Sequence, residues 1–244
     1  MLAVIPARYA STRLPGKVLM EVAGKPVVQH VYERTCQARL VDDCVVATDD
    51  ERVVEALKPF GSNVVMTRPD HPSGTDRIAE VAASASAEII VNVQGDEATI
   101  EPATIDQAIQ PLLDDPAVVM ATLKHRISDP EEIDDPNVVK VVTDKNNRAL
   151  YFSRAPIPAI RDAADKEARG WCYYKHIGLY VYRREFLLAY AKMEPTPLEK
   201  LEKLEQLRAL ENGIEIVVAE TQTDSIGVDS MESFERVKRL LEGS

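Results

Sequence analysis

Short apolar runs alternate with amphipathic stretches through the first half of the chain. Mostly apolar runs of strand length lie at residues 2–5, 44–47, 63–66, 88–93 and 118–123. Between them, apolar residues recur at helical spacing, which predicts helices at residues 27–40, 51–58, 78–87 and 102–113. This alternation predicts an α/β fold with right-handed crossovers, in which a Rossmann-like, mostly parallel sheet is flanked by helices.

The rhythm changes after residue 129. Strand-like residues 138–143 and 149–152 flank the turn signal Asp144-Lys145-Asn146-Asn147, so we expect an antiparallel pair rather than another β/α unit. Residues 153–171 are loop-like. Residues 175–182 alternate as a strand does, which indicates one face that is exposed or covered by a partner.

The last part of the chain closes the fold. Leucines recur every third residue from 198 to 210, which on a helix would trace an apolar stripe for the core or for a subunit contact. A strand at 214–219 and a helix at 232–241 follow. We expect a single domain, 1–244, with an inserted antiparallel or dimerisation subregion at about 130–212.

The loop after the first strand is the first candidate binding site. It carries three cations, Arg8, Arg13 and Lys17, at the carboxyl end of a strand, where open parallel sheets bind ligands. Such charges suit a polyphosphate. A P-loop does not fit, because its first glycine would fall at Ser11 and its last hydroxyl at Val18. Taken alone, the loop is equally consistent with an ordinary solvated turn.

Two strand-end aspartates are candidate metal ligands. Asp96 follows a buried strand, and Asp229 follows another strand and a turn. Two carboxylates, phosphate oxygens and water would make an octahedral oxygen site for Mg²⁺. Asp96 could instead be a simple turn residue, and Asp229 with Glu232 matches a helix N-cap, which is the better reading of Asp229 by itself. Asp229 can bind a metal beside a capped helix only if its side chain faces the site and Ser230 takes the cap.

Other polar residues have structural alternatives of equal or greater weight. Residues 67–77, rich in Pro, Gly and small polar side chains, form a second candidate ligand loop. Arg154 could clamp a carboxylate or merely decorate the surface, and His176, in a strand pattern, is more often packed than catalytic. Because no nucleophile set such as Ser-His-Asp is evident, we expect metal-assisted transfer.

Composition narrows the class of protein. The chain of 244 residues is 45% apolar and 28% charged, with a formal net charge of −11. This acidity argues against nucleic-acid binding and against attraction to an anionic membrane. No apolar stretch approaches the roughly 20 residues of a membrane span, so we expect no membrane insertion and a cytoplasmic protein.

Many separate blocks then resemble one known family. They are IPARYASTRLPGK, VATDD, HPSGTDRIAEV, VNVQGDE, NVVKVV, LYFSRAPIP, HIGLYVYR, LEKLEKLEQLRALENG and GVDSMESFERV. In this order and over nearly the whole chain, they resemble the 3-deoxy-manno-octulosonate cytidylyltransferases, also called CMP-Kdo synthetases. The resemblance implies a nucleotide-diphospho-sugar transferase type of fold. It also implies transfer of CMP from CTP to the 2-hydroxyl of the eight-carbon acid sugar Kdo, with release of pyrophosphate, for lipopolysaccharide biosynthesis.

The resemblance also assigns roles to residues. It implies that the triphosphate is held by Arg8, Ser11, Arg13 and Lys17, and that the cytosine lies near Ala7 and Ser73. Arg77 and Gln94 would help to hold nucleotide or sugar. Asp96 and Asp229 would bind Mg²⁺, and Lys17 would stabilise the departing pyrophosphate. The acid-sugar pocket would be lined by Arg154, His176, Glu202 and Gln206.

Two departures from the family pattern bear on the substrate. Ala98 stands where proline is expected, and Ser230-Met231 replaces a threonine-proline pair. Both leave the aspartates in place but change the stiffness of their loops. The alternatives are therefore activation of 8-amino-Kdo or a sialic-type nine-carbon sugar, or a catalytically silent CTP-binding protein. We expect a homodimer that assembles through the inserted region.

Overall fold

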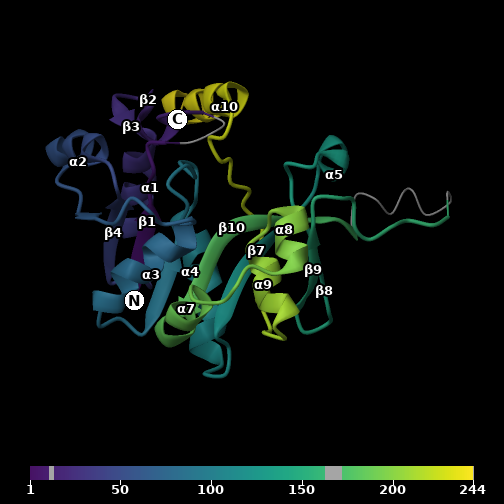
Figure 1. Ribbon diagram of the computed structural model, residues 1–244. Helices are drawn as coiled ribbons and strands as arrows, with labels where there is room; N and C mark the ends of the chain where they lie inside the picture. Colours follow the sequence, from purple (N-terminus) through teal and green to yellow (C-terminus); the bar gives the residue numbers. More distant parts are fainter. Residues whose placement is uncertain (11–13, 163–171, 244) are drawn as a thin grey trace.

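The structure is a computed structural model that describes residues 1–10, 14–162 and 172–243 (Figure 1). Ser11 and Arg13, both predicted to bind the triphosphate, lie outside these residues. The described residues include one sheet of nine strands. These are β1 (Leu2–Pro6), β4 (Asp43–Thr48), β5 (Val64–Met66), β6 (Ile89–Asn92), β7 (Met120–Arg126), β8 (Lys140–Thr143), β9 (Ala149–Ser153), β10 (Tyr174–Arg183) and β11 (Val217–Thr221).

The order of the main strands is β11-β7-β10-β6-β1-β4-β5. β1 pairs in parallel with β4 and β6, β4 with β5, and β11 with β7. β10 runs antiparallel between β6 and β7. The predicted fold class, a mostly parallel sheet flanked by helices, is confirmed. β2 (Glu21–Val22) and β3 (Lys25–Pro26) form a separate two-stranded sheet.

Helices cover both faces of the sheet (Figure 1). They are α1 (Val27–Cys36), α2 (Glu51–Leu57), α3 (Gly74–Ser84), α4 (Pro102–Asp114), α5 (Glu131–Asp134), α7 (Arg184–Tyr190), α8 (Pro197–Glu202), α9 (Gln206–Glu211) and α10 (Met231–Glu242). Short 3-10 helices lie at η1 (Lys17–Leu19) and η2 (Lys58–Phe60). None of the helices in the described part of the chain combines the length and apolar character that a bilayer span requires.

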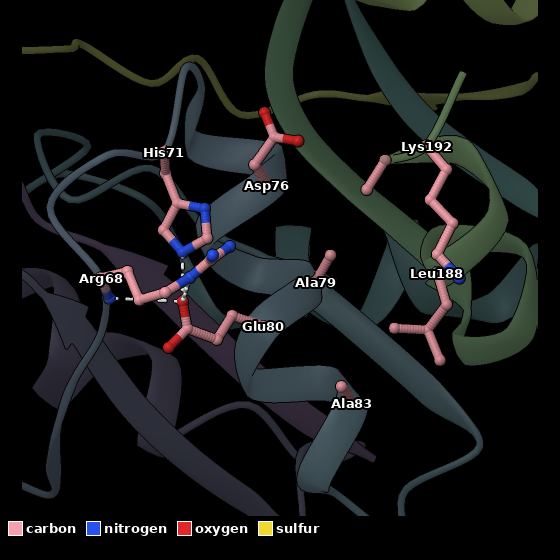
Figure 2. A pocket seen from close by; sticks show the side chains of 9 residues that line it. Arg68, His71, Asp76, Ala79, Glu80, Ala83, Leu188 and Lys192 are labelled. Atoms are coloured by element: carbon pink, nitrogen blue, oxygen red, sulfur yellow. Dashed lines mark hydrogen bonds and ion pairs between the residues drawn. The ribbon is translucent and has the colours of Figure 1, made fainter.

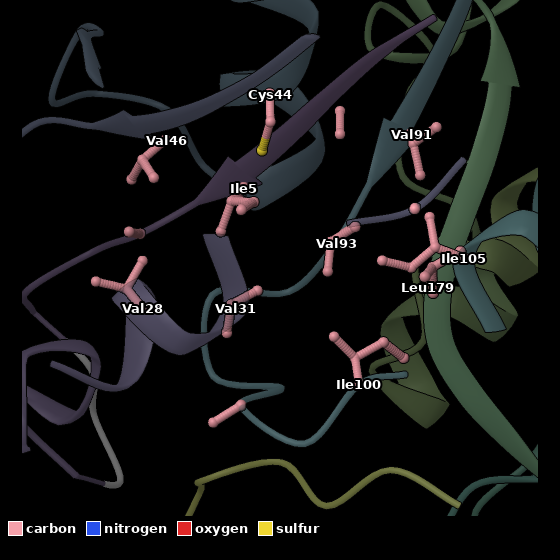
Figure 3. Packing of buried hydrophobic residues seen from close by; sticks show 14 of the residues in the cluster. Ile5, Val28, Val31, Cys44, Val46, Val91, Val93, Ile100, Ile105 and Leu179 are labelled. Atoms are coloured by element: carbon pink, nitrogen blue, oxygen red, sulfur yellow. The ribbon is translucent and has the colours of Figure 1, made fainter. Parts of the chain in front are cut away.

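Alternate side chains of β1 enter two different cores, because successive strand residues point to opposite faces. Ala3 and Ile5 belong to the core under α1 and α4, where Figure 3 shows Ile5 near Val28 and Val31. Leu2 and Val4 belong to the other core, which α3, α7 and α9 cover. Burial on both faces explains why the parallel strands are continuous apolar runs.

The region after residue 129 contains the predicted antiparallel pair. β8 and β9 pair as a hairpin, and Asn147 in its turn has φ 58°. β10 also belongs to the predicted subregion of residues 130–212, yet it lies inside the main sheet. Its residues alternate between buried and partly exposed, as predicted.

Three predicted helices differ from the structure. α1 ends at Cys36, four residues before the predicted end at residue 40. α3 begins at Gly74, four residues before the predicted start, because Ser73 caps it: its Oγ accepts from Asp76 N at 3.2 Å. The leucine stripe of residues 198–210 is not one helix. Lys203 is left-handed (φ 54°) and separates α8 from α9, and Leu201 is 79% exposed. A spacing of three drifts away from the 3.6-residue turn, so these leucines do not share one face.

Candidate functional site

The loops after β1 and β6 meet because one residue between them has no side chain. A Cβ on Gly95 would lie 2.7 Å from the carbonyl oxygen of Pro6, closer than real Cβ contacts come. Glycine therefore permits the backbone after β6 to pass directly against the end of β1. This contact places Asp96 beside the predicted cationic loop.

Lys17 reaches from the cationic loop to Asp96, and the two side chains form an ion pair. Gly16 has φ 73° and its N–H donates to the carbonyl of Tyr9 at 2.9 Å, which closes the loop and starts η1 at Lys17. Both charged side chains are mostly buried, with 15% and 22% of their surfaces exposed. One cation and one metal-ligand candidate thus lie together, as predicted.

Arg8 lies at the junction of the first and second candidate loops. Its guanidinium donates to the carbonyl oxygen of His71, in the loop that precedes α3. Its buried Nε has no hydrogen-bond partner among the described residues. A partly unsatisfied guanidinium at this position retains capacity to bind an anion.

The backbone brings Asp229 to the same place. Val228 N donates to the carbonyl oxygen of Asp96 at 3.0 Å, so the two aspartates lie on backbone segments joined by a hydrogen bond. Ser230, not Asp229, caps α10: its Oγ accepts from Ser233 N at 3.1 Å. One of the two conditions under which Asp229 can serve as a ligand is therefore met. The Asp229 carboxylate itself accepts a hydrogen bond from Ser233 Oγ at 3.3 Å, in the first turn of α10.

The two carboxylates fit a Mg²⁺ ion that is shared with substrate and water better than a metal bound by protein ligands alone. No three His, Cys, Asp or Glu side chains gather as a ready-made metal site within the described residues. Mg²⁺ is commonly bound through one or two carboxylates together with substrate phosphates and water. Asp96, paired with Lys17, and Asp229, on the segment bonded to the Asp96 backbone, match that pattern and would hold a metal best when a polyphosphate is present.

Glu97, next to Asp96, was not predicted as a site residue. Burial and the neighbouring Asp96 raise the pKa of its carboxyl to about 7, although a hydrogen bond from Ser225 Oγ opposes this shift. The sequence signal was available, because a second acid directly follows a strand-end aspartate. Such pairs crowd negative charge where cations bind.

The predicted nucleotide residues of the second loop have partners within the protein. Arg77 is fully buried; its guanidinium donates to Thr67 and lies 3.0 Å from the carboxylate of Asp49. Ser73 donates to Asp76 at 2.7 Å while it caps α3. Ala7 is buried and its N–H donates to the carbonyl of Ala47, so Ala7 contributes backbone and little surface.

Gln94 links this edge of the sheet to β10. Its amide donates to Asn92 Oδ1 at 3.0 Å, and its Cγ lies 3.8 Å from the Cβ position of Gly178. Gly178 is two residues from His176 on β10, so both lie on one face of the strand. Gln94 therefore stands between the predicted nucleotide and sugar residues.

His176 is enclosed by aromatic rings. Its Nε2 lies 2.9 Å from Thr122 Oγ1, and its ring centroid is 5.1 Å from Phe152 and 5.2 Å from Tyr180. Burial lowers the pKa of His176 to about 3, so the ring is neutral at physiological pH. Tyr180, four residues along the same face, was missed, although strand alternation could have indicated it.

Arg154 and Glu202, both predicted sugar residues, lie together. Glu202 accepts from Ser153 Oγ at 2.7 Å and from Arg154 N at 3.0 Å, and the Arg154 side chain donates to the Glu202 carbonyl at 2.7 Å. Gln206 is buried, and its Nε2 has no partner in the part of the chain that the structure describes.

A cavity of about 510 Å³ opens between α3 and α7 (Figure 2). Glu80 accepts from Arg68 and pairs with His71 on one wall, while Leu188 and Lys192 come from the other. Among the described residues, none of those predicted for the site lines it. Two lining residues contact residues predicted for the site: the His71 carbonyl accepts from Arg8, and Asp76 accepts from Ser73.

A mostly parallel α/β sheet whose strand-end loops bring Lys17 to Asp96 fits the class of nucleotidyltransferases. Comparison with known proteins narrows this class. The family model described as cytidylyltransferase matches residues 2–216. A 3-deoxy-manno-octulosonate cytidylyltransferase of Geobacter metallireducens is 60% identical over 98% of this chain and 96% of its own length. One of Solibacter usitatus is 58% identical, over 100% and 95%.

The chain therefore belongs to the 3-deoxy-manno-octulosonate cytidylyltransferase family. A solved structure of CMP:2-keto-3-deoxy-manno-octonic acid synthetase complexed with CTP matches it with a TM-score of 0.92 and 45% identity, covering 99% of this chain and 98% of that one. A cytidylyltransferase of Leptospira borgpetersenii, at 15% identity and a TM-score of 0.65, shares the fold, with 99% of this chain and 86% of that one covered. The family resemblance predicted from the sequence is confirmed.

Proposed function

We propose that this protein transfers CMP from CTP to the 2-hydroxyl of Kdo, releasing pyrophosphate and giving CMP-Kdo for lipopolysaccharide biosynthesis. The observation that supports this most is the convergence of three segments: Lys17 pairs with Asp96, and Val228 bonds to the Asp96 carbonyl just before Asp229. A cationic loop and two carboxylates at one sheet edge suit a nucleoside triphosphate. The relatives' names supply the sugar.

In the reaction, the sugar's 2-hydroxyl loses its proton to water and its oxygen bonds to the α-phosphorus, while the bond from that phosphorus to the bridging oxygen breaks. Pyrophosphate leaves with the electron pair. The α-phosphate oxygens repel the incoming nucleophile, so Arg8 and Lys17 act by spreading the negative charge. Lys17 stabilises the charge that develops on pyrophosphate. Positioning and charge stabilisation suffice without a covalent intermediate.

The proposed cofactor is Mg²⁺, held by Asp96 and Asp229. When bound, it supplies positive charge at the phosphates and lowers the pKa of the attacking hydroxyl. Lys17 occupies Asp96 in the structure described here, so we propose that Lys17 moves its charge to the triphosphate when the substrate binds. Ser11 and Arg13 complete the phosphate contacts in this proposal, and Ala7 and Ser73 face the cytosine.

The sugar pocket is proposed at Arg154, His176, Glu202 and Gln206, with Gln94 at its boundary to the nucleotide. The neutral His176 ring and the unpartnered Gln206 amide suit hydroxyl groups, which both donate and accept. Arg154 suits the sugar's carboxylate. Arg77 supports the second loop through Asp49 and helps to hold the nucleotide.

A homodimer in the cytoplasm completes the proposal. Two large apolar side chains of the region 130–212 stand in solvent: Leu150 is 63% exposed and Leu201 is 79% exposed. Exposed leucines of this kind favour a covered surface. Size-exclusion chromatography with light scattering tests the dimer, and a mass of one chain contradicts it.

The decisive test is pyrophosphate release from CTP with a panel of Kdo, 8-amino-Kdo and a nine-carbon sialic-type sugar, with and without Mg²⁺. We expect turnover with Kdo that depends on Mg²⁺. Asp96→Asn or Asp229→Asn should reduce turnover by about 10³-fold or more, because each removes charge that the transition state needs. Asp114→Asn, the same change at the end of α4, should leave turnover unchanged.

Thermal unfolding should show that the variants remain folded. Normal turnover by both variants would contradict the metal assignment. CTP binding without pyrophosphate release across the whole panel would instead favour a catalytically silent CTP-binding protein.

A further inference from the structure

Asp229 is carried by a segment with no regular structure of its own. Residues 223–229, all within the described range, form neither helix nor strand between β11 and the start of α10. We call residues 224–229 the strap. A segment without a backbone ladder keeps its position only through the groups that contact it. The position of Asp229 therefore depends on what holds the strap and on Ser233 in α10, whose Oγ accepts from Asp229 N at 3.0 Å.

The loop that carries Asp96 holds most of the strap. Ser225 Oγ donates to Glu97 Oε2, and Ile226 N donates to Thr99 Oγ1 at 2.9 Å. Val228 N donates to the Asp96 carbonyl at 3.0 Å. These bonds come from three of the four residues that precede Asp229, so the two loops are bonded side by side.

Glu97 lies closely against the strap at Gly227. A Cβ on Gly227 would lie 3.1 Å from Glu97 Oε1, so the strap passes closely over this carboxylate at its glycine. Glu97 Oε2 holds Ser225 on the near side of that glycine. One carboxylate thus contacts the strap with both oxygens.

The other end of the strap is bonded to β10. Lys175 Nζ lies 2.7 Å from Asp224 Oδ2, and 2.9 and 3.0 Å from the two oxygens of Glu132. Lys175 is 8% exposed and immediately precedes His176, a proposed sugar residue. A largely buried, fully paired lysine fixes where the strap begins.

We propose that Glu97 is a positioning residue that sets Asp229 opposite Asp96, and thereby sets the affinity of the site for a divalent cation. This inference rests on the proposed function, because it assumes that the two aspartates are the ligands. Glu97 acts through its hydrogen bond with Ser225 and through its close packing under Gly227. Removing the side chain frees the middle of the strap and misplaces one of two ligands.

Binding of Mn²⁺ to the full chain tests this without reference to turnover. Free Mn²⁺ is measured by electron paramagnetic resonance as it is titrated, with CTP present and no sugar, into wild type, Glu97→Ala, Glu97→Gln and Asp96→Asn, and CTP without protein gives the baseline. We expect Glu97→Ala to weaken binding about tenfold and Asp96→Asn to abolish it. Glu97→Gln should bind nearly as wild type, because its amide oxygen can still accept from Ser225.

Glu101→Gln is the matched control, since Glu101 pairs with Arg34 at 3.0 Å at the start of α4. It should bind Mn²⁺ as wild type does. If Glu97→Ala fails to fold, Ser225→Ala removes the hydroxyl that Glu97 holds and should weaken Mn²⁺ binding several-fold. Thermal unfolding of each variant separates loss of the site from loss of the fold.

Two results overturn the proposal. Glu97→Ala with wild-type affinity shows that the strap does not need Glu97. Glu97→Gln as weak as Glu97→Ala shows that the charge of Glu97 matters, as it would for a direct ligand. Wild-type protein that binds no Mn²⁺ contradicts the proposed metal site itself, which distinguishes that failure from these two.

Discussion

Two regions hold their polar residues in different ways: the sheet edge that carries Gly95, Asp96 and Asp229, and the region of residues 197–211. At the edge, backbone decides: Gly95 lies against the Pro6 carbonyl, and Val228 bonds to the Asp96 carbonyl. In the second region, side chains decide. Arg208 pairs with both oxygens of Glu199, at 2.8 and 2.5 Å, with each side chain 10% exposed.

This difference separates residues that can bind a ligand from residues that stabilise the fold. Where the backbone sets the geometry, as at Asp96, the side chain can exchange its partner Lys17 for a ligand while the loop keeps its position. Where side chains set the geometry, as at Arg208 and Glu199, their charges are already neutralised. Stability should therefore fall when a side chain is enlarged at the first kind of site, and when a side chain is truncated at the second.

The largest expected effect is in the second region. Arg208→Ala should lower the free energy of unfolding by about 3–5 kcal/mol, because it leaves Glu199 buried without its partner. The pair itself lowers the pKa of Glu199, which shows how strongly its charged form is held. Denaturant unfolding measures the change.

The control for Arg208→Ala is Lys58→Ala, which removes a pair to Glu55 at 3.6 Å with both side chains about 70% exposed. Exposed pairs contribute about 0–1 kcal/mol. Equal losses in the two variants would show that the Arg208 pair is no more structural than a surface contact.

The next effect tests the backbone-built edge. Gly95→Ala adds one methyl group 2.7 Å from the Pro6 carbonyl and should destabilise the fold by about 1–3 kcal/mol. Gly74→Ala is the matched control, because its Cβ would meet Pro6 Cγ at an ordinary 3.6 Å. Unfolding curves for the two variants should differ clearly; coincident curves would mean that the edge can yield.

The smallest effect is a pH dependence on the sugar side. The pKa of His176 is lowered to about 3 by burial, whereas an unfolded histidine titrates near 6.5. The unfolded state therefore takes up a proton first as pH falls, and stability is lost below about pH 6.5. Between pH 6.5 and 5.5 the loss from this group should be about 1 kcal/mol.

The measurement is the unfolding free energy of wild type and His176→Gln at both pH values. Wild type should lose about 1 kcal/mol more than the variant. A variant with the same pH dependence as wild type would show that His176 is not held neutral.

Much of the fold could be predicted from the sequence because its strands are buried on both faces. The run at 2–5 and the helix from Pro102 lie within a residue or so of their predicted bounds. The placement of β10 could not be predicted, since alternation indicates a strand but not its neighbours. The break at Lys203 was missed because a left-handed lysine carries no sequence signal.

The candidate site divides in the same way. The sequence placed Asp96 close to the first loop, where Lys17 pairs with it, but it favoured Asp229 as the cap of α10, which is wrong because Ser230 caps this helix. Glu97 and the strap were not found, because their role depends on contacts across about 130 residues of chain. Only the folded structure brings those segments together.

The central position of β10 has a consequence for engineering. Because this strand is bonded to β6 on one side and β7 on the other, residues 130–212 cannot be exchanged as a module between relatives. A chimera meant to change sugar preference would also have to transfer the strands that pair with β10, which are β6 and β7. Sugar selectivity in this fold thus depends on keeping β10 paired with β6 and β7.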